Sequence, residues 1–319
     1  MKIGVFTAIL SDRSFEAALD QLAGLGAEAV EVGAGGYPGA HHCDTAALLA
    51  DPGAARAWRD AVATRGLVVS ALSAHANPLH PDPSEAAEAR AVLERALAVA
   101  ELLEVPVVNC FSGCPGDGPD ARVPNWITTP WPAEFAALLE WQWEERALPY
   151  WTQTAELAAR RGVRIAIEPH PGFLVYNVGT LLRLREAAGP AVAANFDPSH
   201  LWWQGTDPLE AIRVLGEADA LAHVHAKDTW LNEHVIRVHG VLDTTPRDRI
   251  AQRAWAFRTV GYGQGDQAWR DLISALRIAG YDGVVSVEHE DPLLSAEDGL
   301  AKALDLLLRV RPGSTDDPH

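Results

Sequence analysis

The sequence predicts a single α/β domain, one closed barrel of eight parallel strands in which a helix follows each strand. Short apolar runs alternate with helical patterns eight times along the 319 residues. No linker richer in Gly, Pro or Ser than its neighbours interrupts this rhythm. The alternative is an open, doubly wound sheet. The Gly-rich turn of a dinucleotide-binding sheet is missing after the first apolar run, where Thr7-Ala8-Ile9-Leu10 stands instead.

The first four strand–helix units occupy the first half of the chain. Their apolar runs have strand length, and the segments between them repeat apolar residues at helical spacing. The expected strands are 2–7, 27–33, 67–75 and 105–112, and the first three helices are 14–25, 53–65 and 84–104. A Trp-rich insertion follows the fourth strand and leads into a helix that ends near residue 161.

The second half repeats the pattern. The expected strands are 163–168, 191–197, 220–227 and 283–288, with helices at 178–188, 207–217, 267–279 and 296–309. A long loop separates the seventh strand from its helix. We expect the barrel domain to cover residues 1–311, and residues 312–319 to form a polar, disordered tail.

The charge balance limits the classes of partner. With 43 acidic and 26 basic residues the formal net charge is −17, which disfavours nucleic acid and anionic membranes as partners. No apolar stretch has the length of a membrane-spanning helix, and the N-terminus lacks the pattern of a signal peptide. The three cysteines are expected to be reduced, and Cys110 and Cys114 to be buried and inert. We therefore expect a soluble, cytoplasmic protein.

Alternation within the strands predicts which side chains face the barrel interior. In four successive strands of the second half, one face is apolar and must meet the helices, so the face with the polar residues points inward. At or next to the carboxyl ends of these strands the inward residues are Glu168, Asp197, His225 and Glu288. Barrel enzymes build their sites at this end. The four side chains are therefore expected to converge.

Three carboxylates and one imidazole in a shared cavity favour a bound cation, because unpaired like charges raise one another's pKa. Oxygen-rich ligation with one nitrogen suits one divalent ion, Mn²⁺ first, with Mg²⁺, Co²⁺ and Zn²⁺ as alternatives. The competing interpretation is that each residue is an ordinary strand-end group. His223 also faces inward but lies about 6–7 Å deeper than His225. We expect it to be a core histidine that contacts a neighbour such as Asn195 or Ser286.

Four motifs at these strand ends resemble the xylose isomerase-like barrel family of sugar isomerases and epimerases, which also contains the apurinic endonuclease IV group. They are Ile167-Glu168-Pro169-His170, Phe196-Asp197-Pro198-Ser199-His200, His223-Val224-His225-Ala226-Lys227-Asp228 and Val287-Glu288-His289-Glu290-Asp291. The resemblance implies that Glu168, Asp197, His225 and Glu288 bind the metal and that His200 reaches a substrate oxygen. It covers about residues 1 to 310.

The chain departs from two branches of that family. Ketose 3-epimerases carry a second Glu and an Arg where this sequence has Leu174 and Leu231. The endonucleases bind three metals through extra ligands. Here His75 ends the third strand in a matching place, but the fourth strand ends Asn109-Cys110-Phe111 without a histidine, so one metal is expected.

The expected chemistry is proton abstraction next to a sugar carbonyl, through an enediolate that the metal stabilises. Glu168 and Glu288 are the expected catalytic residues, one removing and one returning the proton. Isomerisation and epimerisation lead the hypotheses. Elimination or C-glycoside cleavage on a 3-keto-sugar, by this chain alone or with a partner subunit, is the alternative, and a phosphodiesterase of the endonuclease IV type ranks below both.

Residues near the motifs complete the predicted site. The expected substrate-binding residues are His75, His170, His200, Lys227, Arg258, Trp202 and Trp230. Lys227 either neutralises an anion or pairs with Asp228. The expected partner is a small sugar or keto-sugar. The eleven tryptophans either stack on sugar or pack the insertion, against the barrel or a second subunit. A homo-oligomer and a partner subunit therefore stay open.

Overall fold

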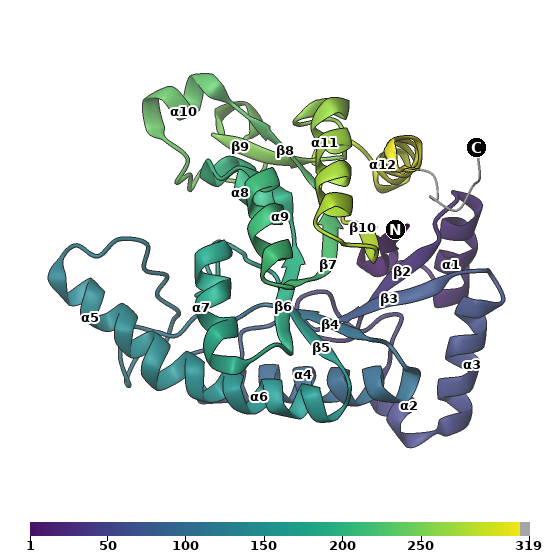
Figure 1. The fold of residues 1–319 in the computed structure, drawn as a ribbon, viewed down its shortest axis with the longest axis horizontal. Helices are drawn as coiled ribbons and strands as arrows, with labels where there is room; N and C mark the ends of the chain where they lie inside the picture. The colour runs from purple at the N-terminus through teal and green to yellow at the C-terminus, as the bar shows by residue number, and fades with distance from the viewer. Residues whose placement is uncertain (313–319) are drawn as a thin grey trace.

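The structure, a computed structural model, describes residues 1–312, which form a closed barrel of eight parallel strands (Figure 1). This confirms the fold expected from the sequence. The strands are β1 (Lys2–Phe6), β2 (Ala29–Gly33), β3 (Val68–Ser73), β4 (Val107–Cys110), β5 (Arg164–Ile167), β6 (Val192–Phe196), β7 (Leu221–Ala226) and β10 (Val284–Val287). The first strand pairs with both β2 and β10, so the sheet closes on itself. The predicted tail, apart from residue 312, lies outside the described residues.

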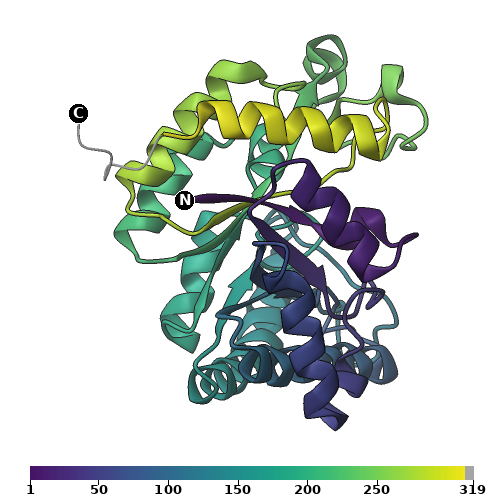
Figure 2. The same cartoon turned by 90° about the vertical axis from the view of Figure 1, so that its right-hand side faces the viewer.

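Helices surround the barrel. They are α1 (Phe15–Gly24), α2 (Thr45–Ala50), α3 (Pro52–Ala63), α4 (Pro83–Leu103), α5 (Ala133–Trp141), α6 (Leu148–Arg160), α7 (Val178–Ala188), α8 (Pro198–Gln204), α9 (Pro208–Glu217), α10 (Glu233–His239), α11 (Gly265–Ile278) and α12 (Ala296–Val310). Figure 2 shows α12 beside the N-terminal strand, where the barrel closes. Within residues 1–312, no helix has the length and apolar character needed to cross a membrane.

Polar caps explain where several helices begin. The side chain of Asp82 accepts a hydrogen bond from Ser84 N, and Pro83 occupies the first turn of α4. Asn177 and Thr180 form a capping box at the start of α7, which begins and ends where the sequence pattern placed it. Helices with such caps begin within a few residues of the positions that the sequence predicts.

Several short elements were not predicted. The long loop expected after β7 contains an antiparallel pair, β8 (Asp228–Leu231) and β9 (Trp255–Arg258), and the helix α10. The helices α2 and α8 have six and seven residues. Two turns of helix or less carry too few residues to show a period of 3.6, so their sequence pattern cannot be told from a loop.

The main core lies between the outer faces of the strands and the helices. Trp143 and Trp151, from the segment after β4, are fully buried in it, and Trp151 Nε1 donates a hydrogen bond to Ser112 O at 2.9 Å. These two indoles therefore pack the segment against the barrel. The loop before α5 and α5 itself extend away from the strands on the side opposite α1 and α3 (Figure 1).

The interior of the barrel is polar. Asn195 pairs in register with His223, and Ser286 with His225, so these inward residues form successive layers. All four are buried. Within residues 1–312, a small apolar cluster of Ala71, Val107 and Ala166 lies apart from the main core. The interior therefore offers hydrogen-bonding groups directly beneath the carboxyl ends of the strands.

Candidate metal centre

Four side chains meet at the carboxyl ends of four neighbouring strands. Glu168, Asp197 and Glu288 directly follow β5, β6 and β10, while His225 lies one residue before the end of β7. One potential ligand atom from each residue lies within 4.8 Å of those of the other three. The structure thus brings together the four residues that the alternation of the strands selected.

Asp197 is held by the start of α8. Its Oδ1 atom accepts a hydrogen bond from Ser199 N at 2.8 Å, as an N-cap residue does. This bond fixes the carboxylate, so its second oxygen Oδ2 points at the cluster and lies 3.3 Å from His200 Nε2. The helix start therefore sets the position of one candidate ligand.

His225 faces carboxylates with both ring nitrogens. Its Nδ1 atom lies 3.1 Å from Glu288 Oε2 and 3.4 Å from Glu168 Oε2, and Nε2 lies 3.0 Å from both oxygens of Glu31. Burial alone would lower the pKa of His225, but Glu31, Glu288 and Glu168 outweigh it and raise the pKa well above its usual value. The Nδ1 atom is the one directed at the candidate ligands.

His223 lies deeper, as expected. Its Nδ1 atom is 3.1 Å from Asn195 Oδ1 and its Nε2 atom is 3.1 Å from Ser70 Oγ. The expected contact with Asn195 is confirmed. Burial is the main reason that the pKa of His223 falls to about 4, so this ring is neutral at physiological pH.

Glu31 is a functional candidate that the sequence analysis missed. It is fully buried in β2, and it accepts hydrogen bonds from Ser73 Oγ and, at 2.9 Å, from Asn109 Nδ2. Its carboxylate contacts His225 Nε2. The sequence did contain a signal for Glu31. It stands between two valines that point outward, so its own side chain points into the barrel.

Three histidines surround Glu168. His200 Nε2 donates a hydrogen bond to Glu168 Oε1 at 3.0 Å, and His75 Nε2 lies 3.2 Å from Oε2. Burial raises the pKa of Glu168, but His200, His225 and His75 outweigh it, and the pKa lies well below its usual value. The carboxylate is therefore ionised. The ring of His170 packs 4.1 Å from that of His200, and burial lowers its pKa to about 3.

Lys227 lies among the carboxylates. Its Nζ atom is 2.7 Å from Glu288 Oε2, 3.0 Å from Asp197 Oδ2 and 3.1 Å from Glu290 Oε1. Burial would lower the pKa of Lys227, but these carboxylates raise it well above its usual value, so it stays charged. The alternative pairing of Lys227 with Asp228 is wrong.

Asp228 instead holds the turn between β9 and α11. Its two oxygens accept hydrogen bonds from the backbone N–H groups of Gly261, Gly263 and Gln264 and from Trp269 Nε1, at 2.9 to 3.1 Å. These hydrogen bonds satisfy the Asp228 carboxylate, so Asp228 does not require an ion pair with Lys227.

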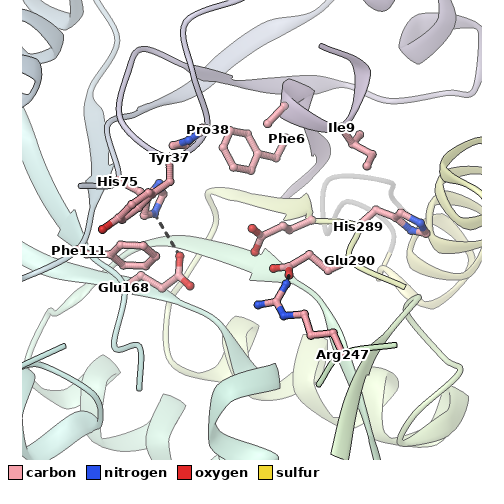
Figure 3. Close-up of a pocket in the computed structure, with 12 residues that line it drawn as sticks. Phe6, Ile9, Tyr37, Pro38, His75, Phe111, Glu168, Arg247, His289 and Glu290 are labelled. Carbon is pink, nitrogen blue, oxygen red and sulfur yellow. Dashed lines mark hydrogen bonds and ion pairs between the residues drawn. The ribbon is translucent and has the colours of Figure 1, made fainter. Parts of the chain in front are cut away.

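A cavity of about 460 Å³, which we call the central cavity, opens over the cluster (Figure 3). Glu168 and Glu288 both line it. Figure 3 shows His75 and Phe111 beside Glu168 on one side, and Glu290 with Arg247 across from them. The remaining lining residues are Phe6, Ala8, Ile9, Tyr37, Pro38 and His289. Two carboxylates thus face a space large enough for a small ligand.

Three expected substrate-binding residues lie elsewhere. Arg258 Nε is bound to Asp291 at 3.0 Å, so its charge is already paired. Trp202 packs its ring 5.7 Å from that of Trp269, and Trp230 lies in β8. None of the three lines the central cavity. The other four expected residues lie beside the candidate ligands: His75, His170 and His200 lie around Glu168, and Lys227 contacts Glu288. Of these four, His75 lines the central cavity.

The donor set fits a divalent cation. It offers carboxylate oxygens and one imidazole nitrogen, the ligand types preferred by Mn²⁺ and similar ions. Asp197 Oδ2 is buried and, among residues 1–312, accepts no hydrogen bond, although Lys227 Nζ is 3.0 Å away. This oxygen has an ion-pair partner in the Lys227 ammonium group, and because it accepts no hydrogen bond it keeps a lone pair for a cation.

Comparison with known proteins places the chain in a family. Residues 19–310 match the model of the xylose isomerase-like TIM barrel family. The protein YfiH of Bacillus subtilis (strain 168), itself uncharacterized, is 39% identical over 311 residues, which cover 96% of this chain and 98% of YfiH.

Solved structures agree at the level of the fold. A D-tagatose 3-epimerase-like protein superposes with a TM-score of 0.66 at 18% identity, covering 97% of each chain. The IolI protein, solved with a bound zinc atom, superposes with a TM-score of 0.64 at 19% identity, covering 97% of this chain and 98% of IolI. The match to the family model spans most of the barrel. The chain therefore belongs to the xylose isomerase-like TIM barrel family.

Proposed function

We propose that this protein is a sugar isomerase or epimerase that depends on one divalent metal ion and moves a proton next to a carbonyl group. The observation that carries the proposal is the convergence of Glu168, Asp197, His225 and Glu288, with one atom of each within 4.8 Å of the others. The sugar epimerases among the structural neighbours support the substrate class.

Those four residues would hold the ion, for which Mn²⁺ is the first expectation. A divalent cation held by these residues would supply positive charge beside the substrate oxygens and so would make the neighbouring C–H group more acidic. The carboxylates of Glu168 and Glu288 bring negative charge and proton-accepting oxygens to the same cavity.

Glu168 and Glu288 are suited to move the proton. Burial raises the pKa of Glu288, but Lys227 and His225 outweigh it and lower the pKa to about 2. Both carboxylates are therefore ionised at neutral pH, and each can accept a proton. Return of the proton to the opposite face of the same carbon gives an epimer, and return to the adjacent carbon gives an isomer.

The neighbouring side chains hold these groups in place. His200 donates to Glu168, and the Lys227 ammonium group contacts Glu288. These contacts fix both carboxylates before the substrate binds, which lowers the entropic cost of orienting them toward the reacting carbon. His200 is also the residue that we expect to reach a substrate oxygen.

Solvent deuterium tests the proposal. The protein is incubated with Mn²⁺ in deuterated water with a panel of aldoses, ketoses, sugar phosphates and 3-keto-glycosides, and the products are analysed by mass spectrometry and NMR. We expect deuterium at one carbon, and at least about a hundredfold slower exchange in Glu168→Gln and Glu288→Gln. Glu156→Gln, a change on the exposed face of α6, is the control. No exchange with any sugar, or undiminished exchange in both variants, would refute the proposal.

A further inference from the structure

Lys227 contacts two of the four candidate metal ligands. Its Nζ atom lies 2.7 Å from Glu288 Oε2 and 3.0 Å from Asp197 Oδ2. The same Glu288 oxygen lies 3.1 Å from His225 Nδ1, the ring nitrogen that is directed at the candidate ligands. A positive charge that belongs to the protein itself therefore lies against the proposed metal centre.

Asp197 has only one oxygen to offer to the cluster. Its Oδ1 atom accepts the hydrogen bond from Ser199 N at 2.8 Å, at the start of α8. The other oxygen, Oδ2, is the one that Lys227 Nζ contacts. An ion held by Oδ2 would share this oxygen with the ammonium group, and two cations beside one oxygen repel each other. Binding of the ion therefore works against the position of Lys227.

Burial makes this conflict strong. The side chains of Lys227 and Asp197 are 1% and 0% exposed. The ring of Phe257 lies 4.7 Å from Nζ, so the ammonium group is enclosed by an aromatic ring as well as by carboxylates. Charges that are buried in this way are screened little by salt and water. The repulsion between Lys227 and an ion is therefore large enough to affect how tightly the ion binds.

Glu290 offers Lys227 another partner within the cluster. Its Oε1 atom lies 3.1 Å from Lys227 Nζ, and Glu290 is not one of the four candidate ligands. The ammonium group of a lysine has three donor hydrogens and lies at the end of a flexible stem. It can therefore keep its contact with Glu290 while it leaves Asp197 and Glu288.

We infer that Lys227 sets the metal affinity of the centre, because it competes with the divalent ion for Asp197 and Glu288 and moves toward Glu290 when the ion binds. The inference rests on the metal centre of the proposed function. Lys227 does not line the central cavity, so it is a positioning residue that acts through the two carboxylates. Its removal should increase the metal affinity, whereas removal of a residue that only holds the ligands in place would decrease it.

Calorimetric titration of the chelator-treated protein with Mn²⁺ tests the inference. Lys227→Met keeps an apolar stem and removes the charge, so the affinity for Mn²⁺ should rise at least about tenfold. The melting temperature gives a second readout. Without the ion, the variant should melt at a lower temperature than the wild type, because buried carboxylates lose their partner. Mn²⁺ should then raise the melting temperature of the variant more than that of the wild type.

Two further variants make the result decisive. Lys2→Met is the matched control. Lys2 is exposed at the amino end of β1, the end of the barrel opposite the cluster, so the same chemical change there should leave the affinity unaltered. Lys227→Gln removes the charge and keeps a group that can donate hydrogen bonds to the carboxylates. It should also raise the affinity, and it decides the matter if Lys227→Met does not fold.

A double-mutant cycle tests the role of Glu290. Glu290→Gln alone should lower the affinity for Mn²⁺ at least about threefold, because the displaced ammonium group loses its remaining partner. In the Lys227→Met protein, the same change should lower the affinity less than about twofold. An equal effect of Glu290→Gln in the two proteins would overturn the movement of Lys227 toward Glu290.

Two other outcomes separate this inference from the proposed function. If the wild type binds Mn²⁺ and the affinity is unchanged or lower in Lys227→Met and Lys227→Gln, the inference is overturned and the metal centre stands. If neither the wild type nor any variant binds Mn²⁺, the metal centre is refuted, and the inference with it. Deuterium exchange into sugars is measured separately and tests the reaction alone.

Discussion

At the scale of single residues, the contacts of His225 are the most informative. Glu31 contacts its Nε2 atom, and its Nδ1 atom lies toward Glu168 and Glu288. A carboxylate that binds the outer nitrogen of a ligating histidine fixes the orientation of the ring and raises its basicity. Glu31 is therefore expected to act on the metal through His225.

Replacing Glu31 tests this role. Glu31→Gln keeps the size of the side chain and removes its charge, so the affinity for Mn²⁺ should fall by about 10- to 100-fold. The measurement is metal titration of the chelator-treated protein, with circular dichroism to verify the fold. Glu156→Gln makes the same chemical change at the surface and should leave the affinity unaltered. An unchanged affinity in Glu31→Gln would show that Glu31 only fills space.

The cysteines give a prediction about pH. Burial raises the pKa of Cys43 and that of Cys114 from 9.0 to about 12, and it raises the pKa of Cys110 as well. Well below pH 9.0 most of the thiol groups are protonated in both the folded and the unfolded chain. Between pH 9.0 and about 12 only the unfolded chain ionises, so stability should decrease as the pH rises through this window.

Alkylation measures the same property directly, because the thiolate is the reactive form. At pH 8 iodoacetamide should leave the three cysteines of the native protein unmodified and label all three in urea, as read by mass spectrometry. Labelling of the native protein at the rate seen in urea would contradict the burial of these thiols.

The alternation of inward and outward side chains along each strand was enough to predict the inward-facing candidates in the second half of the barrel. It selected Glu168, Asp197, His225 and Glu288, because a period of two leaves only one inward face. It did not reveal the partners of Lys227, since those depend on how far neighbouring strands and loops extend. Arg258 was expected to face the substrate, but Asp291 pairs with it across two segments that are distant in the sequence.

At the scale of elements, the regular strand–helix units were predictable and the short additions were not. Each regular helix buries a stripe of apolar residues, which repeats often enough to be recognised. The β8–β9 pair has strands of four residues each, and its stability comes from contacts distant in the sequence. One such contact is the set of hydrogen bonds that Asp228 accepts from the turn after β9.

Asp228→Asn tests the importance of these bonds. The amide group would point donor hydrogens at backbone N–H groups, so the unfolding free energy should fall by at least about 2 kcal/mol. Urea unfolding measures the change. Asp271→Asn, on the exposed side of α11, is the matched control and should change stability little. Equal stability of both variants would mean that other contacts hold the turn.

At the scale of the whole molecule, the barrel holds the candidate site without help from an ion. The core packs between strands and helices, and the four candidate ligands lie at the strand ends rather than within it. Chelation is therefore expected to remove activity and leave the fold intact. The sequence shows eight alternating strand–helix units, and each strand has one inward face. These two patterns determine the barrel, so its architecture could be predicted from the sequence.

The metal content of two histidine variants tests the central claim most directly. Wild-type protein, His225→Ala and His223→Asn are dialysed against Mn²⁺, freed of excess metal and analysed by mass spectrometry for bound ions. We predict about one ion per chain in the wild type and in His223→Asn, and none in His225→Ala, because only His225 directs a ring nitrogen at Glu168 and Glu288. Metal retained by His225→Ala and lost from His223→Asn would contradict the account.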